Sequence, residues 1–211
     1  LHDRLFFQMA FVRRRLGHPP GLVRHAARRL VGYETRVPFP GEAKGLSMKL
    51  AIQIIPYKSS KHIAPLLASL KQQTFRDFEL WFYDNSEDAA ESAACRALVE
   101  QSGLPARYIV AEKNIGFAGG NDAMFRLHEA PFIMLLNDDA RLEPTYLEHA
   151  IRRIESDPKI GSVSGLVYRW RDDDERVIDT AGLEYKCLGQ IVDRWAGTHH
   201  ASRITRQAEE V

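Results

Sequence analysis

Residues 132–139, with the sequence FIMLLNDD, decide the fold of this chain. Five apolar residues in succession are typical of a short strand that is buried on both faces, as the strands of parallel sheets are. Asn137, Asp138 and Asp139 follow at once, so three polar side chains stand where that strand ends. Ligands of open parallel sheets bind beyond the carboxyl ends of the strands. The stretch therefore predicts an α/β fold with a binding site at one edge of its sheet.

The sequence on either side repeats the alternation of strand and helix. Apolar runs predict strands at residues 49–56, 78–83 and 107–111, and shorter strands at 163–168, 177–179, 183–185 and 190–192. Helical spacing predicts one helix that begins at Ser59 or Ser60, one that follows residues 116–121, and others at 89–102 and 144–157. Strands that alternate with helices form a mostly parallel sheet flanked by helices, which is the fold class we expect.

The acidic cluster at residues 137–139 is the strongest candidate site. Mg²⁺ and Mn²⁺ prefer hard oxygen ligands, namely carboxylates and the phosphates of a substrate. If the strand continued through the cluster, Asn137 and Asp139 would point to one side and Asp138 to the other, which favours Asp139 as the metal ligand. Asn-Asp-Asp is equally typical of a plain turn after a strand, and the pattern alone leaves both interpretations open.

Two other segments carry groups that could bind a nucleotide. Asp84 follows the strand at residues 78–83, and its carboxylate could accept hydrogen bonds from a pyrimidine ring or from ribose hydroxyls, although a bare loop fits the pattern as well. Residues 116–121 (GFAGGN) are rich in glycine and lead into a helix, so backbone N–H groups could approach a phosphate. Their spacing matches neither a Rossmann fingerprint nor a P-loop.

Charge is distributed unevenly along the 211 residues. The whole chain has 29 Lys and Arg against 28 Asp and Glu, but residues 1–47 hold nine basic residues against three acidic ones. Apolar spacing predicts two helices in this basic leader, at residues 3–16 and 20–31, and a linker rich in proline and glycine ends near residue 47. Residues 48–211 would then form the α/β domain. No nucleic-acid-binding motif accompanies the charge, so we expect no nucleic-acid partner.

Several features exclude other classes of protein. Cys95 and Cys187 stand far apart and outside zinc-ligand spacing, which predicts neither a disulfide framework nor a zinc site and favours a cytoplasmic protein. The charged run at residues 171–176 indicates a solvated loop, and His199 and His200 lack a nearby third ligand. No apolar run reaches the roughly 18 residues of a membrane span, and the first residues do not form a signal peptide.

Several stretches occur here in the order found in the family 2 glycosyltransferases: AIQIIPYKSS, SLKQQTFRDFELWFYDNSED, NIGFAGGND, FIMLLNDDARLEP, and IGSVSGLVYRW with VIDTAGLEY. Residues 48–195 resemble this family, and most closely its rhamnosyltransferase-like branch. The resemblance implies the GT-A fold, a Mg²⁺ or Mn²⁺ cofactor, and an inverting transfer of a sugar such as rhamnose. The donor would be a dTDP- or UDP-linked sugar and the acceptor a glycan or a lipid-linked glycan, as in polysaccharide and cell-wall biosynthesis.

The resemblance also implies roles for individual residues. Asp139 takes the last position of the family's DxD-type metal motif, with Asn137 in the first position and Asp138 between them. Asp84 lies where the family binds the base or the ribose, and Tyr57 lies in the loop that lines the nucleotide pocket. The stretch that packs under the donor or contacts it contains the remaining candidates, Asn114, Gly116, Gly119 and Asn121.

Two features depart from the family's pattern. Pro56, Tyr57 and Lys58 replace the usual Thr-Tyr-Asn after the first strand, and Lys58 could contact a phosphate. The family takes its general base from an acidic motif on the acceptor side, and no such motif stands before Val211. We therefore assign no catalytic base and expect the domain to be truncated on its acceptor side.

Other functions fit parts of the pattern. A catalytically incomplete nucleotide-sugar-binding or scaffold module on the same fold would need no general base. A sugar nucleotidyltransferase would need a glycine-rich, basic phosphate loop after the first strand, which residues 56–60 do not supply. The basic leader, residues 1–47, would either lie on an anionic membrane, at the inner face of the plasma membrane, or pack on the α/β domain.

Overall fold

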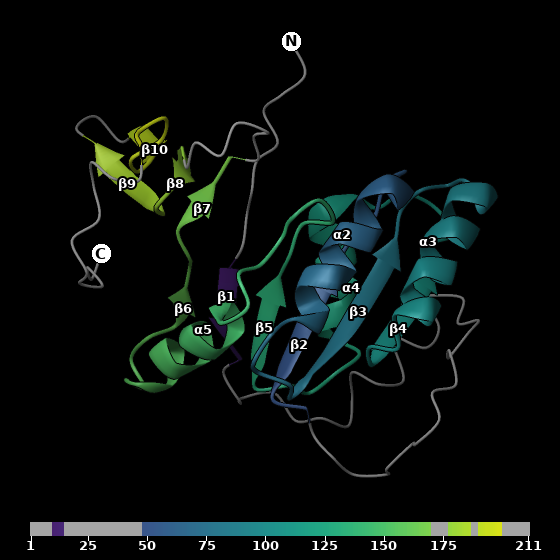
Figure 1. The fold of residues 1–211 in the computed structure, drawn as a ribbon, viewed down its shortest axis with the longest axis horizontal. Coiled ribbons are helices and arrows are strands. Elements are labelled where there is room, and N and C mark those ends of the chain that lie inside the picture. Colours follow the sequence, from purple (N-terminus) through teal and green to yellow (C-terminus); the bar gives the residue numbers. More distant parts are fainter. Residues whose placement is uncertain (1–9, 15–47, 170–176, 187–189, 200–211) are drawn as a thin grey trace. The chain divides into compact units, whose positions relative to one another are not determined.

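The computed structural model describes residues 10–14, 48–169, 177–186 and 190–199 (Figure 1). The chain divides into two compact units, of which one, Gln8–Val163, holds the main sheet, and the other contains the described residues from Ser164 onward. No helix in these described stretches is long and apolar enough to cross a membrane.

Six strands form the main sheet, in the order β4-β3-β2-β5-β1-β6. In chain order they are β1 (Ala10–Arg13), β2 (Leu50–Ile54), β3 (Phe78–Asp84), β4 (Ala106–Val110), β5 (Phe132–Leu135) and β6 (Ser162–Val163). β2 lies parallel to both β3 and β5, and β3 lies parallel to β4. β1 runs antiparallel to both of its neighbours, β5 and β6. This mostly parallel sheet confirms the predicted α/β fold class.

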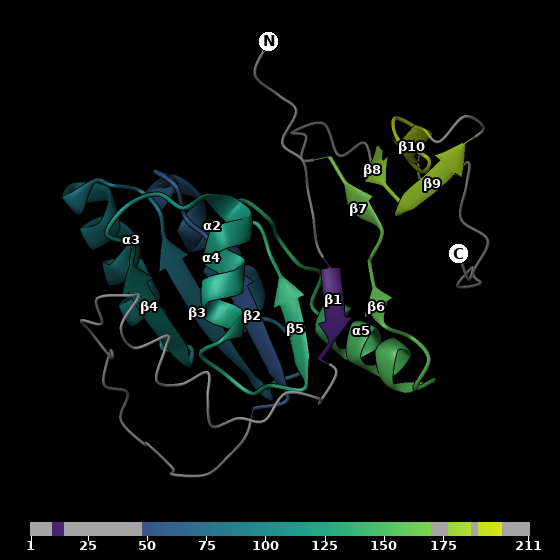
Figure 2. The same cartoon turned by 180° about the vertical axis from the view of Figure 1, so that it is seen from behind.

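Four helices of the described residues cover the sheet: α2 (Ser60–Lys71), α3 (Ala89–Ser102), α4 (Gly116–Phe125) and α5 (Tyr146–Glu155). α2 packs against α3 on one face, and α4 covers the opposite face (Figures 1 and 2). Under α4, Met124 packs in a buried cluster with Trp81 and Tyr83 of β3. Because helices cover both faces, every residue of β2 is buried, which explains the continuous apolar runs in the sequence.

The helix predicted at residues 3–16 is wrong where the structure describes this segment, because Ala10–Arg13 is the strand β1. Phe11 is fully buried, and its ring lies 6.0 Å from the ring of Tyr146 at the start of α5. Phe11 pairs with Met134 of β5 on one side and with Val163 of β6 on the other. Pairing on both edges supplies hydrogen bonds that a helix would have to make internally, so tertiary context overrides the helical spacing.

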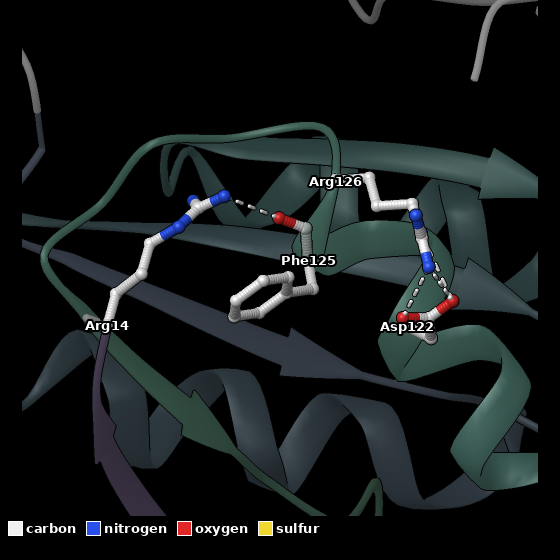
Figure 3. Close-up of polar contacts among 4 residues, drawn as sticks. All are labelled: Arg14, Asp122, Phe125 and Arg126. Atoms are coloured by element: carbon white, nitrogen blue, oxygen red, sulfur yellow. Dashed lines mark hydrogen bonds and ion pairs between the residues drawn. The ribbon is translucent and has the colours of Figure 1, made fainter. Parts of the chain in front are cut away.

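Arg13 at the end of β1 and Arg14 after it form hydrogen bonds with carbonyls at the ends of two helices. Arg13 donates from Nε to the carbonyl of Ile160 at 3.2 Å and from Nη2 to the carbonyl of Ile154 in the last turn of α5. Arg14 donates from Nη2 to the carbonyl of Phe125 at the end of α4 at 3.2 Å, and its guanidinium lies 4.5 Å from the centre of the Phe125 ring (Figure 3). Cations at helix C-termini satisfy carbonyls that have no partner within the helix.

The other unit contains two short antiparallel pairs: β7 (Val167–Tyr168) with β8 (Ile178–Thr180), and β9 (Leu183–Lys186) with β10 (Gln190–Asp193). Strands therefore occur in three of the shorter regions predicted from the sequence, whereas the strand predicted at residues 163–168 is divided between β6 of the main sheet and β7. The rest of the leader, the linker that ends near residue 47, residues 171–176, Cys187 and His200 lie outside the described residues. The division of the chain at residue 47 stays a prediction.

Candidate functional site

The acidic cluster forms a turn at the carboxyl end of β5. β5 ends at Leu135, and Ala140 N donates to the Asn137 carbonyl at 3.3 Å. Leu136 N donates to the Gln53 carbonyl at 2.9 Å, which keeps this turn beside the end of β2. Because the strand geometry stops before the cluster, strand alternation does not decide where its three side chains point. The contacts of each carboxylate decide it instead.

Asp138 faces the loop that follows β2. Burial raises the pKa of its carboxyl, the nearby polar side chain of Ser59 lowers it, and the charge of Asp139 raises it again. The backbone of Tyr57 also lies near enough to lower this pKa. Asp138 therefore lies beside the loop that carries Tyr57, one of the predicted nucleotide-binding residues.

Asp139 presents an unsatisfied oxygen. Its Oδ1 atom is buried and has no hydrogen-bond partner among the residues that the structure describes. A buried carboxylate oxygen without a partner is costly, and a bound cation or a ligand donor is the usual compensation. The structure thus gives Asp138 and Asp139 different surroundings, and Asp139 is the one with an open oxygen.

The donor set of the turn fits Mg²⁺ or Mn²⁺. It offers carboxylate and amide oxygens, which are the hard ligands that these cations take together with water and substrate phosphates. In the described stretches, no group of three or more His, Cys, Asp and Glu side chains is placed to enclose a metal ion. A cation at Asp139 would therefore have to complete its coordination with water and phosphate oxygens.

Asp84 is buried at the carboxyl end of β3, and both of its carboxylate oxygens accept hydrogen bonds from the protein. The Tyr108 hydroxyl donates to Oδ2 at 2.8 Å, and the Ser86 amide donates to Oδ1 at 2.9 Å. The side chain is only 1% exposed. Asp84 thus fixes the shape of the β3–α3 loop, and its predicted contact with a base or a ribose stays a prediction.

The two residues after Asp84 join this loop to two neighbouring loops. Asn85 donates from Nδ2 to the Gly116 carbonyl at 3.2 Å, and its Oδ1 accepts from Ile115 N at 3.4 Å. Ser86 Oγ accepts from Lys58 N at 3.0 Å. Lys58 has a φ of 52°, a conformation that costs a residue with a side chain about 1 kcal/mol or more. Asp84, Asn85 and Ser86, which we call the loop hub, therefore hold three loops together.

The glycine-rich segment, residues 116–121, forms the first part of α4 itself rather than a loop before the helix, and it lies beside the loop hub. Gly116 has a φ of 74°, and its amide donates to Asn114 Oδ1 at 2.8 Å. A methyl group at Gly119 would come within 3.2 Å of the Ile115 side chain. Asn121 donates from Nδ2 to the Phe117 carbonyl at 3.1 Å, whereas its buried Oδ1 has no partner among the described residues. The hydrogen bond of Asn121 stays within α4 and does not join the acidic turn.

The predicted residues therefore come together through their loops. Tyr57, whose side chain is 53% exposed, lies beside Asp138 through its backbone, and the loop hub contacts Gly116. The sequence prediction missed Tyr108, which no motif singled out. The signal that could have found it is chemical: a tyrosine in a buried strand needs a hydrogen-bond partner for its hydroxyl. That partner is Asp84, whose side chain lies on the same face of the sheet.

The sequence model of the family described as "Glycosyl transferase family 2" matches residues 52–206 of the chain. The chain belongs to this family. An uncharacterized glycosyltransferase of Bacillus subtilis, YwdF, is 30% identical over 121 residues, which are 57% of this chain and 43% of the relative. A second uncharacterized glycosyltransferase, from Haemophilus influenzae, is 30% identical over 115 residues, which are 54% of this chain and 37% of the relative. This family member therefore spans less than half the length of these curated relatives.

A solved mannosyltransferase structure shows the same fold. PcManGT, a mannosyltransferase from Pyrobaculum calidifontis in complex with GDP-Man and Mn²⁺, aligns with a TM-score of 0.51 at 20% identity, over 71% of this chain and 43% of its own. TarS 1–349 of S. aureus, in complex with UDP, aligns with a TM-score of 0.46 at 24% identity, over 52% of this chain and 32% of its own. The family 2 chain has the GT-A fold.

Proposed function

We propose that this chain carries the donor-binding half of a metal-dependent, inverting glycosyltransferase. The observation that carries the proposal is the buried Asp139 Oδ1 without a partner, in the turn that follows β5. It lies at the carboxyl edge of a parallel sheet, where ligands of such folds bind. Family membership supports the same class of reaction.

Each part of the site has a task in this proposal. Mg²⁺ or Mn²⁺, when bound, would supply positive charge against the diphosphate that leaves with the nucleoside. Asp139 would hold the cation with Asn137, while Asp138 lies beside the Tyr57 loop. Asp84 would hold the base or the ribose, and the first amides of α4 would face the donor beside Asn114.

The donor and the acceptor are proposed from the resemblance and from composition. We infer a dTDP- or UDP-linked sugar, with rhamnose as the first candidate, because the chain resembles the rhamnosyltransferase-like branch. The acceptor would be a glycan or a lipid-linked glycan of a surface polysaccharide, at the cytoplasmic face of the membrane. The basic composition of residues 1–47 supports a peripheral contact with anionic lipid. The carboxylate that removes the acceptor's proton is assigned to no described residue.

The second candidate function is a nucleotide-sugar-binding module that does not transfer sugar. The departure at Pro56, Tyr57 and Lys58, where the family usually has Thr-Tyr-Asn, favours it. Both candidates share the donor site and differ only in turnover. Release of sugar from a UDP- or dTDP-linked donor, with or without an added acceptor, therefore separates them.

Binding of a nucleotide panel tests the shared part. UDP, dTDP and GDP would be titrated into the chain by calorimetry with Mn²⁺ present and after chelation with EDTA. We expect at least one nucleoside diphosphate to bind with Mn²⁺, and binding to weaken by about tenfold or more after chelation, since a cation held by Asp139 would supply the positive charge that attracts the phosphates. Binding of none of the three, or equal affinity in both conditions, would contradict the proposal.

A further inference from the structure

Tyr108 is a buried polar group in the interior of β4, and no motif accounts for it. Its side chain is 1% exposed and stacks on the ring of Phe82, with ring centres 5.7 Å apart. The hydroxyl lies 2.8 Å from Asp84 Oδ2 and 3.5 Å from the Ser92 carbonyl, so the carboxylate is the nearer acceptor. A tyrosine used only for packing would need no such alignment, and phenylalanine would fill the same space.

The surroundings keep this hydroxyl protonated and directed at Asp84. Burial raises the pKa of Tyr108 far above its usual range, and the charge of Asp84 raises it further. The Cys95 thiol lies beside the same hydroxyl, and burial raises the pKa of this thiol to about 11. The hydroxyl therefore acts as a fixed donor, and the Asp84 carboxylate accepts its hydrogen bond.

We propose that Tyr108 is a positioning residue for the nucleotide site and acts through Asp84. Its hydroxyl holds one carboxylate oxygen while the Ser86 amide holds the other, so the carboxylate has a single orientation. The same carboxylate shapes the loop that contacts Lys58 and Gly116. Without the hydroxyl, Asp84 Oδ2 would be a buried charged oxygen in need of a new donor, and the loop hub would rearrange to supply one.

This inference rests on the proposed function, because it assumes that the chain binds a nucleoside diphosphate. The test uses Tyr108→Phe, which keeps the ring that stacks on Phe82. The matched control is Tyr83→Phe, a buried tyrosine in β3 whose ring packs on the opposite face, under α4. UDP binding with Mn²⁺ would be measured by calorimetry for both variants, and urea unfolding would show how much each loses in stability.

We expect Tyr108→Phe to weaken UDP binding by about tenfold, in line with a lost hydrogen bond to a charged group. Tyr83→Phe should leave the affinity within about twofold. If the two variants bind UDP equally well, the inference is overturned while the proposed function stands. If the unmodified chain binds none of UDP, dTDP and GDP more tightly with Mn²⁺ than without it, both are overturned.

A double-mutant comparison tests whether Tyr108 acts through Asp84. Asp84→Asn and the double variant Asp84→Asn with Tyr108→Phe remove the buried charge, so both should fold even where Tyr108→Phe alone does not. We expect these two variants to bind UDP within about twofold of each other, since Asp84→Asn already removes the charged acceptor of the Tyr108 hydroxyl. A further tenfold loss in the double variant would overturn the inference.

Discussion

Asn85 offers the sharpest test of the loop hub, because an isosteric change reverses one of its two hydrogen bonds. Asn85 is 2% exposed, donates to the Gly116 carbonyl at 3.2 Å and accepts from Ile115 N at 3.4 Å. Asn85→Asp keeps the shape and the acceptor but places a carboxylate oxygen against the Gly116 carbonyl. The variant therefore loses a hydrogen bond and buries an unpaired charge.

The expected cost at neutral pH is about 2–4 kcal/mol of the free energy of unfolding, from one lost hydrogen bond and one unsatisfied buried group. For a chain of this size that corresponds to a fall in Tm of roughly 5–15 °C. The new carboxyl would have a raised pKa in the folded state, so the folded chain would bind more protons than the unfolded one. Stability would then be recovered as the pH falls, because the protonated carboxyl can again donate to Gly116.

Urea unfolding at neutral and at mildly acid pH measures both effects. The matched control is Asn114→Asp, because Asn114 is exposed and accepts from the amide of Gly116, so an aspartate keeps that hydrogen bond. The control should change stability by less than about 0.5 kcal/mol. Equal stability of Asn85→Asp and Asn114→Asp at neutral pH would refute the loop hub as described.

Three further predictions concern stability. Asp138→Asn should stabilise the metal-free chain at neutral pH, because burial raises the pKa of Asp138. The stability that the protonated carboxyl confers is lost as the pH rises through that pKa. The gain in the free energy of unfolding from the substitution should therefore vanish when unfolding is measured below the unfolded pKa of about 4. Gly116→Ala and Gly103→Ala should each cost about 1 kcal/mol in urea unfolding, since their φ angles are 74° and 68°, but only Gly116→Ala should also weaken UDP binding. Phe11→Ala should cost about 3–5 kcal/mol and Val12→Ala less than about 1, as Phe11 is fully buried and Val12 is 37% exposed; equal small effects would contradict the position of β1.

The strand–helix alternation could be predicted from the sequence because burial on both faces leaves a local signature. β2, β3 and β5 each give an apolar run that ends in polar residues. β1 could not be predicted in this way. The spacing of apolar residues around Phe11 fits a helix, and the deciding interactions are with β5 and β6, more than a hundred residues away in the chain.

The site could be predicted in its location but not in its internal contacts. Asp84, Asn137 and Asp139 were expected at the carboxyl ends of strands, and the structure places them there. The contact between Tyr108 and Asp84 joins residues 24 positions apart and depends on the register of β3 against β4. That register pairs Phe82 with Tyr108 and Asp84 with Val110, which brings the tyrosine and the carboxylate to the same face of the sheet. The sequence does not reveal this pairing by itself.

The central claim is that Asp139 holds a divalent cation for a nucleoside diphosphate, and calorimetry of UDP with and without Mn²⁺ tests it most directly. The variants are Asp139→Asn and the control Asp122→Asn, an exposed α4 residue paired with Arg126 (Figure 3). We predict that Mn²⁺ strengthens UDP binding by about tenfold or more in the unmodified chain and in the control, and by less than about twofold in Asp139→Asn. An undiminished effect of Mn²⁺ in Asp139→Asn would contradict the account.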